Sequence, residues 1–178
     1  NIKTILPVMK DDSPEAKENM AELIELIEKS TSRMYEMVER ILDIDAIEEM
    51  KIKLKLKNID LGVVIREVCQ SFQITAERKG IQSIYEISEK LHFSKVDENY
   101  LIQVLENLIS NAIKFSSNDS TIKIFINTMS DMEEIHIKDE GPGISEKEMN
   151  KLFKKYSKLS NKPTAGESSI GLGLSIVK

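Results

Sequence analysis

The sequence predicts an α+β protein in which a helical hairpin is followed by an α/β sandwich. Residues 13–49 place apolar side chains at alternating spacings of three and four, which is typical of a long helix that packs in a bundle. From residue 51 onward the pattern changes to short strands and amphipathic helices. The change falls near residue 50. We therefore expect two parts, 1–50 and 51–178, and expect the second to stop short of a complete domain.

The long helix has a clear start and a continuous apolar seam. Ser13 is a capping residue, Pro14 suits a first helical turn, and Glu15 is an acid near the positive end of the helix dipole. Ser30 fills one polar position of the heptad seam, whose apolar members are Met20, Leu23, Ile27, Met34, Met37, Ile41 and Ile44. Residues 1–10 are too short to cover this seam. We favour homodimerisation through 13–49, as half of a four-helix bundle; packing of the helix on its own domain is the alternative.

The second part predicts alternating strands and helices. Residues 51–57 alternate lysine with apolar side chains, as a half-buried strand does. Asp60 is placed to cap a helix that ends at Gly80. Further strands are expected at 81–87, 92–96, 121–128 and 134–139, further helices at 98–115, 146–155 and 171–178, and a mobile polar loop at 157–170.

Composition and charge exclude some classes of protein. A hydrophobic content of 40% and a net charge of −5 fit a soluble protein and argue against a nucleic-acid partner. Residues 11–50 carry most of the negative charge, either as a solvated helix face or as a partner surface, and the remainder is net positive, which suits an anionic ligand. No apolar run approaches the roughly 20 residues that cross a bilayer. We expect a cytoplasmic location, with any membrane attachment outside this chain.

Two glycine motifs and one helix face carry the candidate chemistry. The glycine motifs are Asp-Glu-Gly-Pro-Gly at 139–143 and Gly-Leu-Gly at 171–173, and either alone could be an ordinary turn. On the predicted helix, Asn107, Asn111 and Lys114 follow one another at i, i+4 and i+7, so they share a face. Amide oxygens suit Mg²⁺ and an ammonium group suits phosphate, although a single Asn on a helix is usually a surface residue.

Four motifs in order make the pattern specific. They are Asn-Leu-x-x-Asn-Ala-x-Lys-Phe at 107–115, Asp-x-Gly-x-Gly-Ile at 139–144, Leu-Phe-Lys-Lys-Tyr at 152–156 and Gly-Leu-Gly-Leu-Ser-Ile-Val-Lys at 171–178. They resemble the N, G1, F and G2 boxes of the sensor histidine kinases. Residues 13–49 are similar to the second helix of that family's dimerisation and phosphotransfer domain. The resemblance implies the ATP-binding sandwich shared by gyrase, heat-shock-90, MutL and histidine kinases.

The resemblance also implies a reaction and its cofactors. With ATP and Mg²⁺, the γ-phosphoryl group would pass to a histidine and then to an aspartate in the receiver domain of a response regulator. Asn111 would coordinate Mg²⁺ with help from Asn107, Lys114 would contact phosphate, and Asp139 would accept a hydrogen bond from the adenine amino group. The other implied site residues are Gly141 and Gly143 beneath the base, Phe153 and Tyr156 at the base of the lid, Lys158 as a phosphate contact, and Gly171 and Gly173 at the lid hinge and phosphates.

The phospho-accepting histidine of the family has no counterpart here. The only histidines are His92 and His136, both expected in ordinary surface or strand roles. We therefore expect the chain to begin after the acceptor, to end inside the last box, and to be unable to autophosphorylate.

Two rival functions are open. One is an ATPase-driven clamp, which needs a Glu general base one turn before the metal-binding Asn. Here Asn107 holds that position, and Glu106 points about 100° away. The other rival is a non-catalytic dimerisation and docking module with the acidic helix as its surface.

Overall fold

The computed structural model describes residues 20–32, 34, 35, 37, 38, 53–130, 132–155, 157, 159–164, 171 and 173–177. The chain forms two compact units, residues 1–50 and 51–178. No helix within the described ranges is long and apolar enough to cross a membrane.

The first unit is helical wherever it is described, from residue 20 to residue 38. Lys29 and Glu25 form an ion pair one turn apart, with Nζ and Oε1 separated by 2.6 Å. Along the predicted seam, Leu23 is half-buried whereas Ile27 and Met34 are 50% and 68% exposed. The predicted helix start at Ser13 and residues 39–49, with Ile41 and Ile44, lie outside the described residues.

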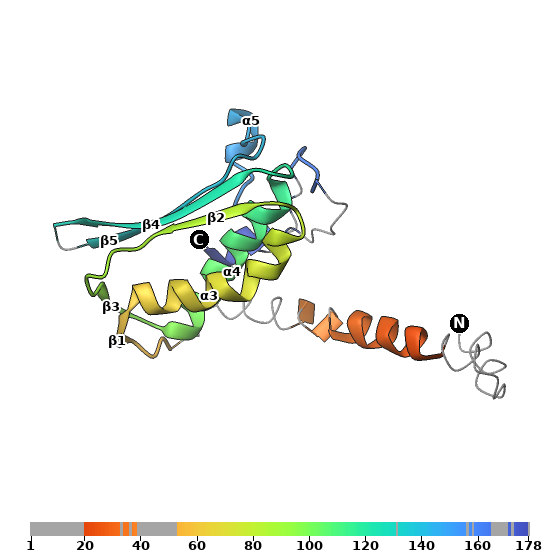
Figure 1. Ribbon diagram of the computed structural model, residues 1–178, viewed down its shortest axis with the longest axis horizontal. Coiled ribbons are helices and arrows are strands. Elements are labelled where there is room, and N and C mark those ends of the chain that lie inside the picture. The colour runs from red at the N-terminus through yellow and green to blue at the C-terminus, as the bar shows by residue number, and fades with distance from the viewer. Residues whose placement is uncertain are drawn as a thin grey trace. The chain divides into compact units, whose positions relative to one another are not determined.

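The second unit contains five strands and four helices among its described residues (Figure 1). In chain order these are β1 (Lys57–Asp60), α3 (Leu61–Glu77), β2 (Gln82–Glu86), β3 (Phe93–Val96), α4 (Glu98–Phe115), β4 (Thr121–Met129), β5 (Met132–Lys138), α5 (Glu146–Met149) and α6 (Gly173–Val177).

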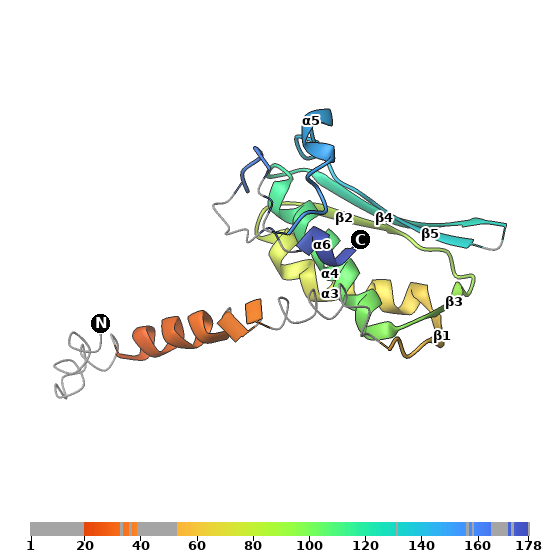
Figure 2. The same ribbon diagram turned by 180° about the vertical axis from the view of Figure 1, so that it is seen from behind.

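The strands form two sheets with helices on one side of the larger one. The larger sheet has the order β2-β4-β5, with β2 parallel and β5 antiparallel to β4. Helices α3 and α4 lie on the same face of this sheet in both views (Figures 1 and 2). The smaller sheet pairs β1 with β3 in antiparallel register. The mixed α/β architecture agrees with the predicted sandwich.

The core lies between these helices and the larger sheet. Its buried members are Leu61, Val64, Ile65, Val68, Cys69 and Ala76 from α3, Ile81 just before β2, Leu105, Ile109, Ala112 and Ile113 from α4, and Ile122 and Ile124 from β4. Ile135 and Ile137 of β5 pack against this cluster. The opposite face of α4 is therefore left for other contacts.

Helix α4 matches its predicted bounds because its start and end are both encoded locally. Asp97 caps the helix by accepting a hydrogen bond from the amide of Asn99 at 3.2 Å, and Glu98 adds an acid to the first turn. Asp60 caps α3 in the same way, through the amide of Gly62 at 3.0 Å. The turn after α3 ends at Gly80, whose φ is +67°.

Two predicted elements were wrong in extent. Residues 53–56 are not a strand, and β1 begins only at Lys57. Its partner β3 ends at Val96 because Asp97 caps α4, and the second carboxylate oxygen of Asp97 instead accepts the amide of Lys55 at 2.7 Å. Helix α5 covers 146–149 rather than 146–155. It has no buried residue, so nothing apolar extends it.

Candidate functional site

The predicted polar face of α4 exists, and its members differ in burial. Asn107 is only 6% exposed, and its Nδ2 donates to the carbonyl oxygen of Gln103 at 2.8 Å. Asn111 and Lys114 are half-buried on the following turns. The Asn107 amide thus has a fixed direction inside the protein, whereas Asn111 and Lys114 are accessible from outside.

The first glycine motif packs closely against the C-terminal end of α4. Asp139 directly follows β5, and its Oδ1 accepts the amide of Gly141 at 2.8 Å. A Cβ atom added to Gly141 would lie 2.8 Å from that oxygen and 3.2 Å from the carbonyl oxygen of Phe115. Only glycine fits this approach. Gly143, with φ of +70°, also has the left-handed backbone that favours glycine.

The second glycine motif packs closely against the middle of the same helix. A Cβ atom added to Gly173 would lie 2.7 Å from Oδ1 of Asn107, a clash that only the absence of a side chain avoids. Gly171, two residues earlier, has φ of +78°. The two glycine motifs therefore meet α4 at Phe115 and at Asn107, which are about 12 Å apart along the helix axis.

The described part of the predicted loop is held by polar contacts. Glu148 accepts hydrogen bonds from the hydroxyl of Ser145 and from the amide of Ser160, and these bonds hold the pKa of the Glu148 carboxyl below its ordinary value. Asn161 donates from Nδ2 to the carbonyl oxygen of Gly143 at 2.5 Å, and Thr164 bonds to the end of α4. Tyr156 and Lys158, both predicted site residues, lie outside the described residues.

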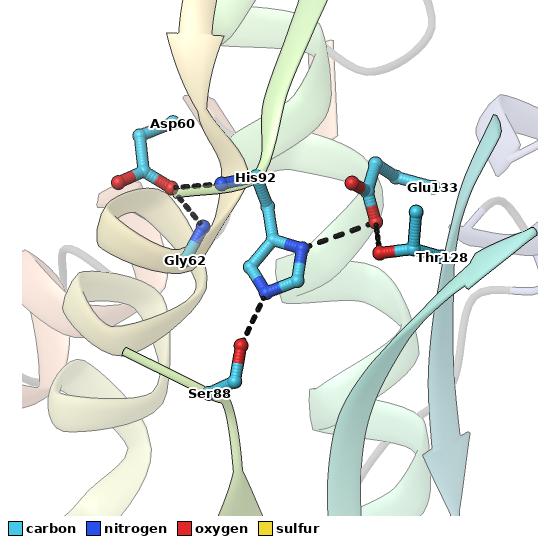
Figure 3. A network of polar contacts seen from close by, with 6 residues as sticks. All are labelled: Asp60, Gly62, Ser88, His92, Thr128 and Glu133. Atoms are coloured by element: carbon cyan, nitrogen blue, oxygen red, sulfur yellow. Dashed lines mark hydrogen bonds and ion pairs between the residues drawn. The ribbon is translucent and has the colours of Figure 1, made fainter. Parts of the chain in front are cut away.

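A buried histidine network was not predicted. His92 was expected on the surface or in a strand, but it is 4% exposed. Its Nε2 lies 2.9 Å from the hydroxyl of Ser88, and its Nδ1 lies 3.1 Å from Oε2 of Glu133 (Figure 3). Its amide donates to Asp60 at 3.3 Å. His92 therefore links β3 to the cap of α3 through its backbone amide, and to β5 through its ring.

The network is structural in character, although it joins a serine, a histidine and a glutamate in one chain of contacts. The same Glu133 oxygen that contacts His92 also accepts the hydroxyl of Thr128 at 2.8 Å. The side chains come from β4, β5 and the loop between β2 and β3, and the His92 amide also contacts Asp60 of β1, so the network ties the smaller sheet to the hairpin of the larger one. The other histidine, His136, stacks on Phe125 with 4.6 Å between ring centroids.

The residues present suit a hard divalent cation held jointly with a ligand. The described ranges contain no group of three or more His, Cys, Asp or Glu side chains that could hold a metal ion. An amide oxygen such as that of Asn111 is a suitable Mg²⁺ donor, and Mg²⁺ commonly takes one or two protein ligands together with substrate phosphates. The polar face of α4 fits that mode of binding.

Comparison with known proteins identifies the family of the domain that contains α4. Residues 96–178, which contain α4 and both glycine motifs, match the family of histidine kinase-, DNA gyrase B- and HSP90-like ATPases. The chain carries the ATPase-type kinase domain of the sensor histidine kinases. The matched range includes Asn107, Asp139 and Gly173.

The relatives of this histidine kinase domain are longer sensor proteins. Sensor protein EvgS of Escherichia coli strain K12 is 31% identical over 169 residues, which are 91% of this chain and 14% of EvgS. Sensor histidine kinase WalK of Bacillus subtilis strain 168 is 25% identical over 179 residues, covering 99% of this chain and 29% of WalK. The chain therefore spans less than a third of these curated relatives.

Solved histidine kinases share the fold. The structure of ThkA in complex with response regulator protein TrrA matches with a TM-score of 0.63 and 27% identity, covering 88% of this chain and 45% of that one. Full-length ShkA in complex with AMPPNP gives a TM-score of 0.75 at 24% identity, covering 94% and 34%. The second likeness supports the fold alone.

Proposed function

We propose that residues 51–178 are the ATP-binding catalytic domain of a sensor histidine kinase and bind Mg-ATP along the polar face of α4. The observation that carries this proposal is the convergence of both glycine motifs on that one helix, at Phe115 and at Asn107. Close backbone approach at both places leaves the accessible side chains of Asn111 and Lys114 between them. Residues 1–50 would contribute the dimerisation and phosphotransfer helices.

Each site residue has a role that its surroundings support. Asn111, assisted by Asn107, would hold Mg²⁺, which supplies charge neutralisation at the phosphates. Lys114 would contact a phosphate oxygen. The Gly141 amide holds Oδ1 of Asp139, and the other carboxylate oxygen would accept a hydrogen bond from an adenine amino group. The remaining proposed contacts are Gly143 beneath the base, Gly171 at the lid hinge, and Lys158, which lies outside the described residues.

The phosphoryl group would leave ATP for a histidine, and then pass to a receiver-domain aspartate in a response regulator, on the cytoplasmic side of the membrane. ThkA, a relative by structure, has been solved with such a regulator. Neither histidine of this chain suits the acceptor role. His92 is buried with both ring nitrogens in contact, and His136 lies against Phe125 and Glu134.

Calorimetric titration tests this proposal. The chain should bind Mg-ATP, bind Mg-GTP more weakly because the guanine carbonyl cannot donate to Asp139, and acquire no label from γ-labelled ATP. Absence of any affinity for ATP would favour the alternative function, a non-catalytic dimerisation and docking module. Acid-labile label on His92 or His136 would show that a histidine in this chain accepts phosphate.

The clamp-type ATPase is less well supported. Asn107 stands where such an enzyme needs a carboxylate, and an amide does not take up a proton at neutral pH. Glu106, the adjacent acid, is exposed, whereas Asn107 is buried against Gly173. The two side chains therefore face different surroundings on α4.

We also propose that the helix within residues 13–49 forms a homodimer. Ile24, Ile27 and Met34 are 49%, 50% and 68% exposed. Burying one such side chain is worth about 1.5–3 kcal/mol, so a partner helix would stabilise this surface.

Sedimentation equilibrium measures this association directly. The wild-type chain should be dimeric at high micromolar concentration, and Ile27→Glu should be monomeric because it places a charge in the seam. Glu28→Gln, one residue further along on an exposed position, is the matched control and should remain dimeric. A wild type that stays monomeric would contradict the dimer.

A further inference from the structure

Thr164 contacts the end of α4 through both its backbone amide and its hydroxyl. Its amide donates to the carbonyl oxygen of Lys114 at 3.0 Å. Its hydroxyl lies 2.8 Å from the carbonyl oxygen of Ser116 and 3.1 Å from that of Lys114. The same hydroxyl accepts from Nζ of Lys79 at 2.6 Å. Thr164 belongs to the described residues 157 and 159–164, called the lid segment below, and is thus bonded to the end of a helix that lies about 50 residues earlier.

Lys79, from a third element, contacts both Thr164 and the end of α4, and this set of contacts is called the junction below. Its Nζ donates to the carbonyl oxygen of Ile113 at 2.7 Å and lies 3.4 Å from that of Lys114. The last carbonyl groups of a helix have no partner within the helix and carry partial negative charge, so an ammonium group there is favourable. Lys79 belongs to the turn after α3, and thereby links α3, α4 and the lid segment.

We propose that Thr164 and Lys79 are positioning residues for the nucleotide. They fix the lid segment to the C-terminal end of α4, while Gly173 contacts Asn107 on the middle of the same helix. Thr164 and Gly173 are then both in place before any ligand arrives. This inference rests on the proposed function, because it assigns the two residues to the same Mg-ATP site.

The physical effect is pre-organisation. A segment that is already held in position has less conformational freedom to lose when a ligand binds, so affinity is higher. Neither residue needs to touch the nucleotide for this effect. Asn161 supports the same arrangement, since its side chain ties the earlier part of the segment to Gly143 in the G1 loop.

The test compares Thr164→Val with Thr164→Ser. Valine keeps the shape of threonine but removes the hydroxyl, whereas serine keeps the hydroxyl. Thr164→Val should bind Mg-ATP about three- to tenfold more weakly, corresponding to the net worth of one or two hydrogen bonds, and Thr164→Ser should bind within about twofold of wild type. Amide exchange at Thr164 should accelerate in the valine variant alone.

Lys79→Met provides an independent arm. It should weaken Mg-ATP binding to a similar extent, and the double variant with Thr164→Val should be no weaker than either single variant, because the two side chains act through one junction. Lys53→Met, which removes the same charge from an exposed position before β1, is the matched control and should bind as wild type.

The outcomes separate this inference from the proposed function. A wild type without nucleotide affinity would overturn both. A wild type that binds Mg-ATP, with unchanged or tighter binding in Thr164→Val and Lys79→Met, would overturn only the positioning role. Equal losses in Thr164→Val and Thr164→Ser would also overturn it, because the hydroxyl would then not be the cause.

Discussion

Replacing Asn111 by alanine should weaken Mg-ATP binding by about tenfold to a hundredfold, the range expected for a lost contact to a charged group. The affinity that remains should no longer depend on Mg²⁺. The reason is that Asn111 is the accessible amide on the polar face of α4, between the two points where glycine motifs approach the helix. Calorimetric titration with ATP, in the presence of Mg²⁺ or of a chelator, measures both effects.

Two further variants make that result specific. Asn118→Ala removes an exposed asparagine just after α4 and should change nothing. Asp139→Asn exchanges an acceptor for a donor and should lower the preference for ATP over GTP by about tenfold, as expected for one hydrogen bond to a charged group. Unchanged affinity in Asn111→Ala together with unchanged selectivity in Asp139→Asn would remove α4 and the G1 loop from the nucleotide site.

Replacing His92 by alanine should lower the free energy of unfolding by about 2–4 kcal/mol, because it leaves a cavity where a buried ring stood and removes the contacts of that ring with Ser88 and Glu133. The ring is 4% exposed and lies between Ser88 and Glu133. Urea denaturation measures the loss. His136→Ala, which removes a ring from a side chain that is 40% exposed, should cost less than about 1 kcal/mol.

The His92 prediction has a pH signature at Glu133. Burial alone would raise the pKa of that carboxyl, but hydrogen bonds from Thr128 and His92 and the charges of His92 and Lys90 bring it below the ordinary value of 4.5. A carboxyl with a lowered pKa stabilises the folded state above its ordinary pKa, and this stabilisation disappears as the pH falls through the folded-state pKa. The difference in stability between wild type and Glu133→Gln should therefore vanish in acid. A difference that is constant with pH would contradict an ionised Glu133 in the network.

The sequence predicted best those elements whose signals are local. Helix α4 has a capping aspartate, an apolar period and a polar face, and all three lie within its own residues. The alternation of residues 51–57 is also local, but pairing with β3 decides where β1 begins, and β3 is stopped by the cap of the next helix. A pattern could indicate a strand there without fixing its ends.

The residue types of the candidate site could be proposed from the sequence, whereas the contacts that support them could not. Asn107, Asp139 and the glycines were proposed because their motifs resemble those of a family. The partners of His92 lie 4, 32 and 41 residues away, and those of Thr164 lie 48 to 85 residues away. No spacing rule connects residues at such separations, so only the folded chain shows that a serine, a lysine or a threonine belongs to these junctions.

The position of α4 links occupancy of the site to the survival of the whole domain. One side of this helix contributes Leu105, Ile109 and Ile113 to the core, and the other side carries the proposed ligand contacts. The binding surface therefore cannot be lost while the rest of the domain persists, as it could be on a peripheral loop. By mass action, a ligand at a hundred times its dissociation constant adds about 2.7 kcal/mol to the stability of such a domain. The melting temperature of this protein should therefore rise with the concentration of nucleotide available to it.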